Sequence, residues 1–440
     1  MEIVTETIYA ESTPKGHGAI SIIRISGVHT LDIINKICPR LRFTPHVQAY
    51  AQIQDQQGII IDQAMIVFHP GPRSYTGEDL SEISCHGNPL VVDRIMDTIA
   101  ETGFARMAYK GEFTRRAFLN GKMDLVQAEA VGAFIGSSSS AGCDMARALL
   151  KGELSEWIQA MRMDLMGIIA DIEASFITDD ASISRDAQRE RLENIINNTG
   201  KILKDVHQAK ALYRGIITTI AGLPNVGKSS LFNAILGYNR AIVHHEEGTT
   251  RDVLKEHLKL DGMEFVFHDT AGIRETSSGP EQIGVEKTIE TLRGSDLVLY
   301  VVDAREGIKP HERQWLTLAD KTIVVMNKID LMEGSINLAE GYDTVAVSAK
   351  FGHGIGDLMA AMKQAFPHDQ PLVFLDRHIH LLHKALDSLI SCHKAIMDGL
   401  TMDVLTIDLK QAFEQLRQIT GETVDEDVLE MVFSRFCIGK

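Results

Sequence analysis

The sequence has few of the features that mark secreted or membrane proteins. Its five cysteines include no CxxC pair, so neither a disulfide framework nor a zinc site is expected. No apolar run approaches the ~18 residues of a membrane span. The opening stretch, "MEIVTETIYAESTPKG", contains no basic segment followed by an apolar core, as a secretory signal would. We therefore expect a cytoplasmic protein with no membrane partner.

The sequence also lacks an excess of basic residues. Its formal net charge is −16. This charge argues against a protein that binds nucleic acid by bulk electrostatic attraction alone, because such binding depends on basic patches that displace counterions. If RNA is a partner, it should meet a local patch, a shaped pocket or a second protein.

Length and local pattern indicate several domains within 440 residues. Residues 1–118 mix short β-branched runs with turn clusters, which predicts an α+β domain. Residues 119–212 and 372–440 show helical spacing of apolar residues, although Gly200 weakens the prediction of one unbroken helix. Residues 213–371 alternate apolar strands with helices, which predicts a parallel sheet covered on both faces. The simplest architecture is an α/β domain inserted into a helical one.

A phosphate-binding motif lies near the start of the α/β domain. The stretch "GLPNVGKS" (222–229) fits G-x-x-x-x-G-K-S and follows a predicted strand. Its glycines let backbone N–H groups surround phosphate oxygens. Lys228 should reach the β- and γ-phosphates, and Ser229 should bind Mg²⁺. Taken alone, the pattern is also compatible with a glycine-rich turn.

Four further motifs follow in the order that GTPases use: "GTTRD" (248–252), "DTAG" (269–272), "NKID" (327–330) and "SAK" (348–350). Thr250 can complete the Mg²⁺ shell. Asp330 can accept two hydrogen bonds from guanine, a pattern that adenine cannot return. The set predicts a Ras-like α/β GTPase domain that binds GTP. The predicted GTP-contacting residues are Asn225, Val226, Gly227, Lys228, Ser229, Ser230, His244, His245, Glu246, Glu247, Gly248, Thr249, Thr250, Asp269, Thr270, Ala271, Gly272, Asn327, Lys328, Asp330, Ser348, Ala349 and Lys350.

The position after "DTAG" departs from Ras-like GTPases. It holds Ile273, where many GTPases have a glutamine that orients the attacking water, so another group must do this. Glu281, in the Gly/Ser-rich stretch "ETSSGPEQIG", is a candidate, and an exposed loop carboxylate is the alternative reading. Asn225 and "HHEEGTT" (244–250) are candidates for holding a cation that offsets the developing charge.

Motifs outside the GTPase domain point to one family. "PRSYTGEDLSEISCHG" (72–87), "GEFTRRAFLNGKMDLVQAEA" (111–130), the inserted GTPase domain and the final "FCIGK" together resemble the MnmE (TrmE) family of tRNA-modification GTPases. The resemblance covers essentially the whole chain. It implies an N-terminal domain similar to tetrahydrofolate-binding domains, which also forms a homodimer. It further implies a GTPase activated when its GTPase domains dimerise in the presence of K⁺.

The resemblance also implies a reaction. With a flavoprotein partner similar to MnmG, the family uses a one-carbon unit from folate, as 5-formyl- or 5,10-methylene-tetrahydrofolate. It installs an aminomethyl-type group, such as carboxymethylaminomethyl, at carbon 5 of the wobble uridine of certain tRNAs.

Site residues follow from the resemblance by position. The positions matching folate contacts are Arg24, Glu82, Lys122 and Lys440. The positions matching K⁺ ligands are Asn225, His244, Glu246 and Thr249. The positions matching catalytic residues are Glu281 and Cys437. If Lys440 reaches the folate, the end of the chain must fold inward and bring Cys437 to the one-carbon site; a structural cysteine is the alternative.

Two other functions stay open from the sequence. Ribosome-assembly GTPases share "NVGKSSL" and "GTTRD", but they usually add a KH-like RNA-binding module, which the sequence does not indicate. A second possibility is a member of the family that hydrolyses GTP but has lost modification and serves as a scaffold. The "HHEE" stretch (244–247) keeps this second reading open, because the family usually has small or aliphatic residues there. The same stretch leaves open how strongly K⁺ activates the enzyme.

Overall fold

The computed structural model describes residues 6–42, 44–137, 139–177, 185–238, 256–267, 289–332, 341–366 and 374–440. Contacts between residues divide the chain into two compact units. Unit 1 comprises residues 1–132, 149–180 and 400–440, and unit 2 comprises residues 133–148 and 181–399. The four domain ranges expected from the sequence remain a prediction.

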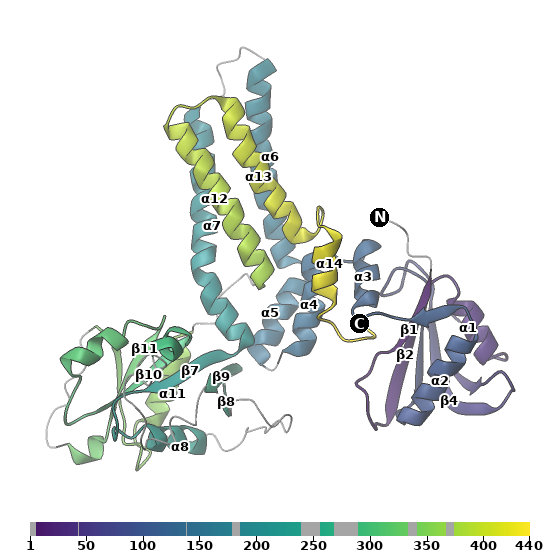
Figure 1. Cartoon of the computed structure of the whole chain (residues 1–440), viewed down its shortest axis with the longest axis horizontal. Helices are drawn as coiled ribbons and strands as arrows, with labels where there is room; N and C mark the ends of the chain where they lie inside the picture. Colours follow the sequence, from purple (N-terminus) through teal and green to yellow (C-terminus); the bar gives the residue numbers. More distant parts are fainter. Residues whose placement is uncertain are drawn as a thin grey trace. The chain divides into compact units, whose positions relative to one another are not determined.

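A six-stranded sheet forms the first part of unit 1 (Figure 1). Its order is β3-β4-β5-β2-β1-β6, and neighbours are antiparallel except for the pair β1 and β6. Two helices accompany these strands. The elements are β1 (Thr7–Glu11), β2 (Ile20–Ser26), α1 (Thr30–Ile37), β3 (Ala49–Gln54), β4 (Ile60–His69), β5 (Leu80–His86), α2 (Pro89–Glu101) and β6 (Ala105–Met107). The α+β fold expected from residues 1–118 is confirmed.

The two faces of this sheet differ. Alternate residues of a strand point to opposite faces. Ile23 and Ile83 are therefore buried under α1 and α2, within one apolar core. The residues one position away, Arg24 and Glu82, lie on the opposite face and are register partners on β2 and β5. The sheet thus places two charged side chains side by side, away from the helices.

Helices complete unit 1. They include α3 (Glu112–Leu119), α4 (Leu125–Gly136), α6 (Glu153–Ile177), α13 (Met402–Thr420) and α14 (Glu426–Phe433). Helix α13 packs along α6, and Arg162 of α6 donates to Glu422, two residues past the end of α13, at 2.8 Å. Apolar residues of α4 and α14 form a second core that includes Leu125, Leu429 and Phe436. The helices expected from residue 119 onward and from residue 372 onward are confirmed.

Unit 2 contains a second six-stranded sheet, of order β12-β11-β10-β7-β9-β8. Its strands are β7 (Ile216–Ala221), β8 (Glu256–Leu260), β9 (Met263–Phe267), β10 (Leu297–Asp303), β11 (Thr322–Asn327) and β12 (Asp343–Ala346). Five strands are parallel, as the continuous apolar runs predict. Separate apolar cores lie on its two faces, one against α8 (Lys228–Tyr238) and α11 (Ile355–Gln364), the other against residues that include Trp315 and Leu316.

One strand departs from the expected parallel sheet. Strand β8 pairs with β9 in the antiparallel sense through a tight turn at Asp261 and Gly262, both of which have positive φ. A two-residue Asp-Gly turn with this backbone twist joins adjacent antiparallel strands. The sequence "LKLDGMEF" carries this hairpin signal, which a search for strand–helix alternation overlooks.

The remaining elements are α5 (Ser140–Leu150), α7 (Arg185–Arg214), α12 (Asp376–Met397) and the short 3₁₀ helices η1 (Pro310–Trp315) and η2 (Ile329–Leu331). Helix α7 continues through Gly200 and packs along α12. Packing of apolar side chains outweighs the cost of one helical glycine, about 1 kcal/mol. Within the described residues, no helix is long and apolar enough to cross a membrane.

Candidate functional site

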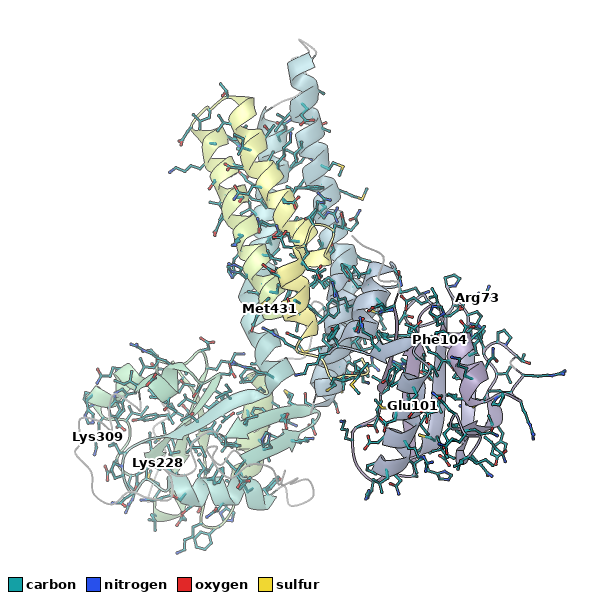
Figure 2. All side chains as sticks on the ribbon, turned by 45° about the vertical axis from the view of Figure 1, so that its right-hand side comes forward. Arg73, Glu101, Phe104, Lys228, Lys309 and Met431 are labelled. Atoms are coloured by element: carbon teal, nitrogen blue, oxygen red, sulfur yellow. The ribbon has the colours of Figure 1, made fainter. Side chains whose placement is uncertain are left out.

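The phosphate loop connects β7 to α8, and Lys228, labelled in Figure 2, is the first residue of that helix. Two of its glycines have positive φ: +142° at Gly222 and +99° at Gly227. A Cβ on Gly222 would lie 2.2 Å from the Val301 carbonyl oxygen, and one on Gly227 would lie 2.4 Å from Asn327 Nδ2. The loop therefore needs glycine because neighbouring strands approach it closely, in addition to any need to admit phosphates.

The loop's own side chains suit an anionic ligand and a cation. Lys228 Nζ donates to the carbonyl oxygens of Gly222 and Leu223, at 3.0 and 2.8 Å, and burial lowers the pKa of Lys228. Asn225, at φ +62°, is exposed. Ser229 and Ser230 are exposed in the first turn of α8, where backbone N–H groups favour phosphate.

The "NKID" and "SAK" residues meet this loop at the carboxyl ends of the strands. Asn327 Nδ2 donates to the Val226 carbonyl at 2.9 Å, and Asn327 Oδ1 accepts from the Ala349 backbone N–H at 3.0 Å. Ser348 Oγ donates to Asp330 Oδ1 at 2.6 Å. One asparagine thus ties the phosphate loop to the "SAK" turn, and a serine orients the predicted guanine-reading carboxylate.

Asp303, which the sequence analysis did not single out, belongs to the same cluster. It ends β10 and is almost fully buried. Its carboxylate accepts from Arg305 Nε and Nη2, at 2.9 and 2.6 Å, and from Lys328 Nζ at 2.9 Å. The hydrogen bonds from Arg305 and then from Lys328 lower the pKa of Asp303. Lys328 Nζ also donates to the Asn225 carbonyl at 2.6 Å, so Asp303 fixes a lysine that contacts the phosphate loop.

Several predicted nucleotide residues lie outside the described residues. They comprise the stretch 244–250, with the proposed Mg²⁺ and K⁺ ligands His244, Glu246, Thr249 and Thr250; the "DTAG" motif at 269–272; and Ile273 and Glu281. The structure therefore brings together the loop at 222–230 with residues 327–330 and 348–350, and the other assignments remain predictions.

A second cluster lies on the open face of the sheet in unit 1. Arg24 donates to Glu82 Oε1 from Nε and Nη2, at 3.0 and 2.7 Å. The guanidinium also sits between two aromatic rings, 5.3 Å from the Tyr75 centroid and 5.6 Å from the Phe113 centroid. Charge pairing and stacking together fix the plane of this guanidinium. Tyr75 and Phe113 were missed as site residues, although both lie inside the motifs that carry the family resemblance.

The loop at 70–79 carries Tyr75 and is held from two sides. Lys122 Nζ donates to the Pro72 carbonyl at 2.9 Å, and Asn120 Nδ2 donates to the Thr76 carbonyl at 2.8 Å. Arg116, only 3% exposed, donates to Glu78 at 3.2 Å and to Glu112 at 2.9 Å. Lys122 therefore supports this loop through the Pro72 carbonyl.

Residues 436–440 fold inward onto the same face, as expected if Lys440 is to reach a ligand there. Arg24 Nη1 and Ser12 Oγ donate to the Gly439 carbonyl at 3.4 and 3.1 Å. The backbone N–H groups of Gly111 and Phe113 donate to the backbone oxygens of Cys437 and Lys440, at 3.3 and 3.2 Å. The Cys437 side chain stays exposed and Lys440 is half-buried. The sequence-predicted residues Arg24, Glu82, Cys437 and Lys440 thus lie in one neighbourhood.

The guanine-side cluster predicts a contrast between two conservative substitutions. Asp330→Asn should move preference from GTP to xanthosine triphosphate, because the amide cannot accept two hydrogen bonds from guanine. Asp303→Asn should weaken the binding of both nucleotides alike, by about tenfold. The substitution removes an ionic partner of Lys328 but does not change the residue that contacts guanine. Equilibrium binding of both nucleotides to both variants distinguishes these roles, and unchanged preference in Asp330→Asn would remove its assignment.

The backbone conformation of Gly439 indicates how residues 436–440 are held against the sheet. Its φ is +90°, and a Cβ there would lie 2.2 Å from the Glu11 carbonyl oxygen. Gly439→Ala should therefore release residues 436–440 and speed amide hydrogen exchange in residues 109–113 at least about tenfold. Gly103→Ala is the matched control, since Gly103 has φ +71° but nothing within 4 Å of its Cβ position. Equal exchange in both variants would contradict the close approach.

The chain is similar to known proteins over its whole length. Residues 125–437 match the family described as "MnmE helical domain", and residues 7–122 match "GTP-binding protein TrmE N-terminus". The tRNA modification GTPase MnmE of Carboxydothermus hydrogenoformans is 38% identical, with 100% of each chain covered. That of Moorella thermoacetica is 39% identical, also with 100% of each chain covered. The chain therefore belongs to the MnmE (TrmE) family of tRNA modification GTPases and is a GTP-hydrolysing enzyme of tRNA modification.

Proposed function

We propose that this enzyme is a K⁺-activated homodimeric GTPase that works with a flavoprotein similar to MnmG. It transfers a one-carbon unit from tetrahydrofolate into an aminomethyl-type group at carbon 5 of the wobble uridine of certain tRNAs. The observation that carries the proposal is the meeting of the Arg24–Glu82 pair with residues 437–440, the segment that contains Cys437. The ribosome-assembly reading does not account for this second site, and the Cys437 experiment described below separates the scaffold reading from the proposed reaction.

The open face of the sheet suits a reduced folate. The folate has a pterin with hydrogen-bonding edges and a tail that carries carboxylates. Glu82, 28% exposed, can accept hydrogen bonds from the pterin edge, and Lys440 and Lys122 offer positive charge to the carboxylates. Arg24 already uses three of its donors within the protein, so it positions Glu82 and the chain end and has fewer donors left for a ligand.

The GTPase half suits hydrolysis assisted by two cations. Lys228 would contact the β- and γ-phosphates, and Ser229 with Thr250 would hold Mg²⁺, which supplies charge stabilisation when bound. K⁺ would be held by Asn225 with His244, Glu246 and Thr249. The exposed side chain of Asn225 and its fixed backbone fit this role. Ile273 cannot orient water, so we assign that role to Glu281.

Glu281 provides a direct test of the hydrolysis mechanism. Glu281→Ala should cut GTP turnover by about 10²–10³-fold and leave GTP binding intact, because the water loses its positioning group while the base and phosphates keep theirs. Glu281→Gln is the matched variant, since it keeps the length of the side chain but not its charge. Turnover near the wild-type rate in Glu281→Ala would exclude this residue.

Cys437 provides the test of the modification itself. We would measure tRNA nucleosides by mass spectrometry in cells that lack the gene and carry either the wild type or Cys437→Ser. The wild type should restore the modified wobble uridine and Cys437→Ser should not, because the serine hydroxyl is a far weaker nucleophile than a thiolate. Cys143→Ser, in the other unit, is the control. Restoration by Cys437→Ser would make Cys437 structural, and failure of the wild type would overturn the proposed reaction.

A further inference from the structure

The residues that follow β6 form an exposed edge beside the segment that contains Cys437. Tyr109 is 70% exposed, and Lys110 is also exposed. Lys110 forms an isolated antiparallel bridge with Ile438, and the next backbone N–H, of Gly111, donates to the Cys437 carbonyl. Tyr109 and Cys437 therefore flank the same short bridge, one on each strand, and both side chains are open to solvent.

The Tyr109 ring is held in place despite its exposure. The Arg106 guanidinium lies 4.6 Å from the ring centroid. Arg106 donates to both carboxylate oxygens of Glu112, at 2.9 and 2.7 Å, and to Glu6 at 2.7 Å. The Tyr109 backbone N–H donates to the same Glu112 at 2.8 Å. A ring that is already positioned loses little conformational entropy when a ligand stacks on it.

Two exposed cations lie in the same two segments, Lys110 directly after Tyr109 and Arg435 two residues before Cys437. Lys110 and Arg435 are both exposed, and neither forms an ion pair with any residue that the structure describes. Glu112 and Glu6, the carboxylates at Tyr109, are already paired with Arg106. In a chain with a net charge of −16, this edge is therefore a local site where an anionic backbone can approach.

We propose that Tyr109 stacks on the wobble base of the tRNA while Lys110 and Arg435 contact adjoining phosphates, so that the uracil ring lies beside Cys437. This inference rests on the proposed function. Single-stranded loops of RNA are recognised by stacking of unpaired bases on aromatic side chains, with basic residues following the backbone.

Binding of tRNA anticodon stem-loops to the full chain tests the inference. The two probes are a stem-loop with uridine at the wobble position and the same stem-loop with an abasic wobble residue. The wild type should bind the first roughly tenfold or more tightly than the second. Tyr109→Ala should bind both alike, whereas Tyr109→Phe, which keeps the ring, should retain the preference. Tyr50→Ala is the matched control, because Tyr50 is 61% exposed on β3, at the opposite edge of the sheet from β6.

Each other outcome overturns the stacking role. The role is excluded if the wild type binds both probes equally or if Tyr109→Ala still prefers the uridine probe. It is also excluded if Tyr50→Ala loses the preference as Tyr109→Ala does. Loss of flavoprotein binding by Tyr109→Ala without any change in the stem-loop preference would assign the edge to a protein instead. Calorimetry with 5-formyl-tetrahydrofolate separates this failure from that of the proposed function: if the wild type binds folate but shows no stem-loop preference, only the stacking role is wrong.

Discussion

The cluster around Arg24 in unit 1 depends on a close approach between two backbones, that of Gly439 and that of Glu11. A side chain at residue 439 would occupy the position of the Glu11 carbonyl oxygen, so only glycine lets the two strands meet. Each hydrogen bond that residues 437–440 form contributes about 1 kcal/mol net, so no single one holds this segment in place. The buried Phe436 ring adds apolar contact with Phe433 of α14. Because the backbone of residues 437–440 makes these contacts, the Cys437 side chain stays exposed.

The same contact connects the chain end with the charged pair on the sheet. Arg24 uses the Nε and Nη2 edge of its guanidinium for Glu82 and its Nη1 donor for Gly439. The rings of Tyr75 and Phe113 pack against this planar group and help fix its orientation. The pair is partly buried, at 18% and 28% exposure, where leaving either charge without its partner would be costly. Arg24 is therefore a positioning residue for the site, a role that residue type alone does not distinguish from ligand binding.

In unit 2, the buried carboxylate of Asp303 also positions other residues of a site, as Arg24 does in unit 1. Asp303 needs positive partners because a nearly buried charge is expensive unless it is paired. It obtains them from Arg305, two residues later on the chain, and from Lys328, the residue that follows β11. Since Lys328 also reaches the phosphate loop, guanine-side and phosphate-side residues are joined through one acid. The parallel register of β10 and β11, which pairs Asp303 with Asn327, makes this arrangement possible.

Much of the fold follows from the sequence alone. Strand β2, whose buried residues alternate, and the continuous apolar strands β10 and β11 were predictable because burial imposes those patterns directly. The persistence of α7 through Gly200 and the antiparallel β8 were not, because the first depends on packing against α12 and the second on a turn signal outside the main pattern.

The motifs were also readable from the sequence. The spacing and order of "GLPNVGKS", "NKID" and "SAK" identified the nucleotide-binding residues, and the whole-chain resemblance identified the family. Only the tertiary structure decided that Arg24 pairs with Glu82 across strands 58 positions apart, that Asp303 holds Lys328, and that Tyr109 and Cys437 flank one bridge. Residue types and local spacing are properties of the sequence. Contacts between distant segments depend on register and on which backbones can approach, and these arise only when the chain folds.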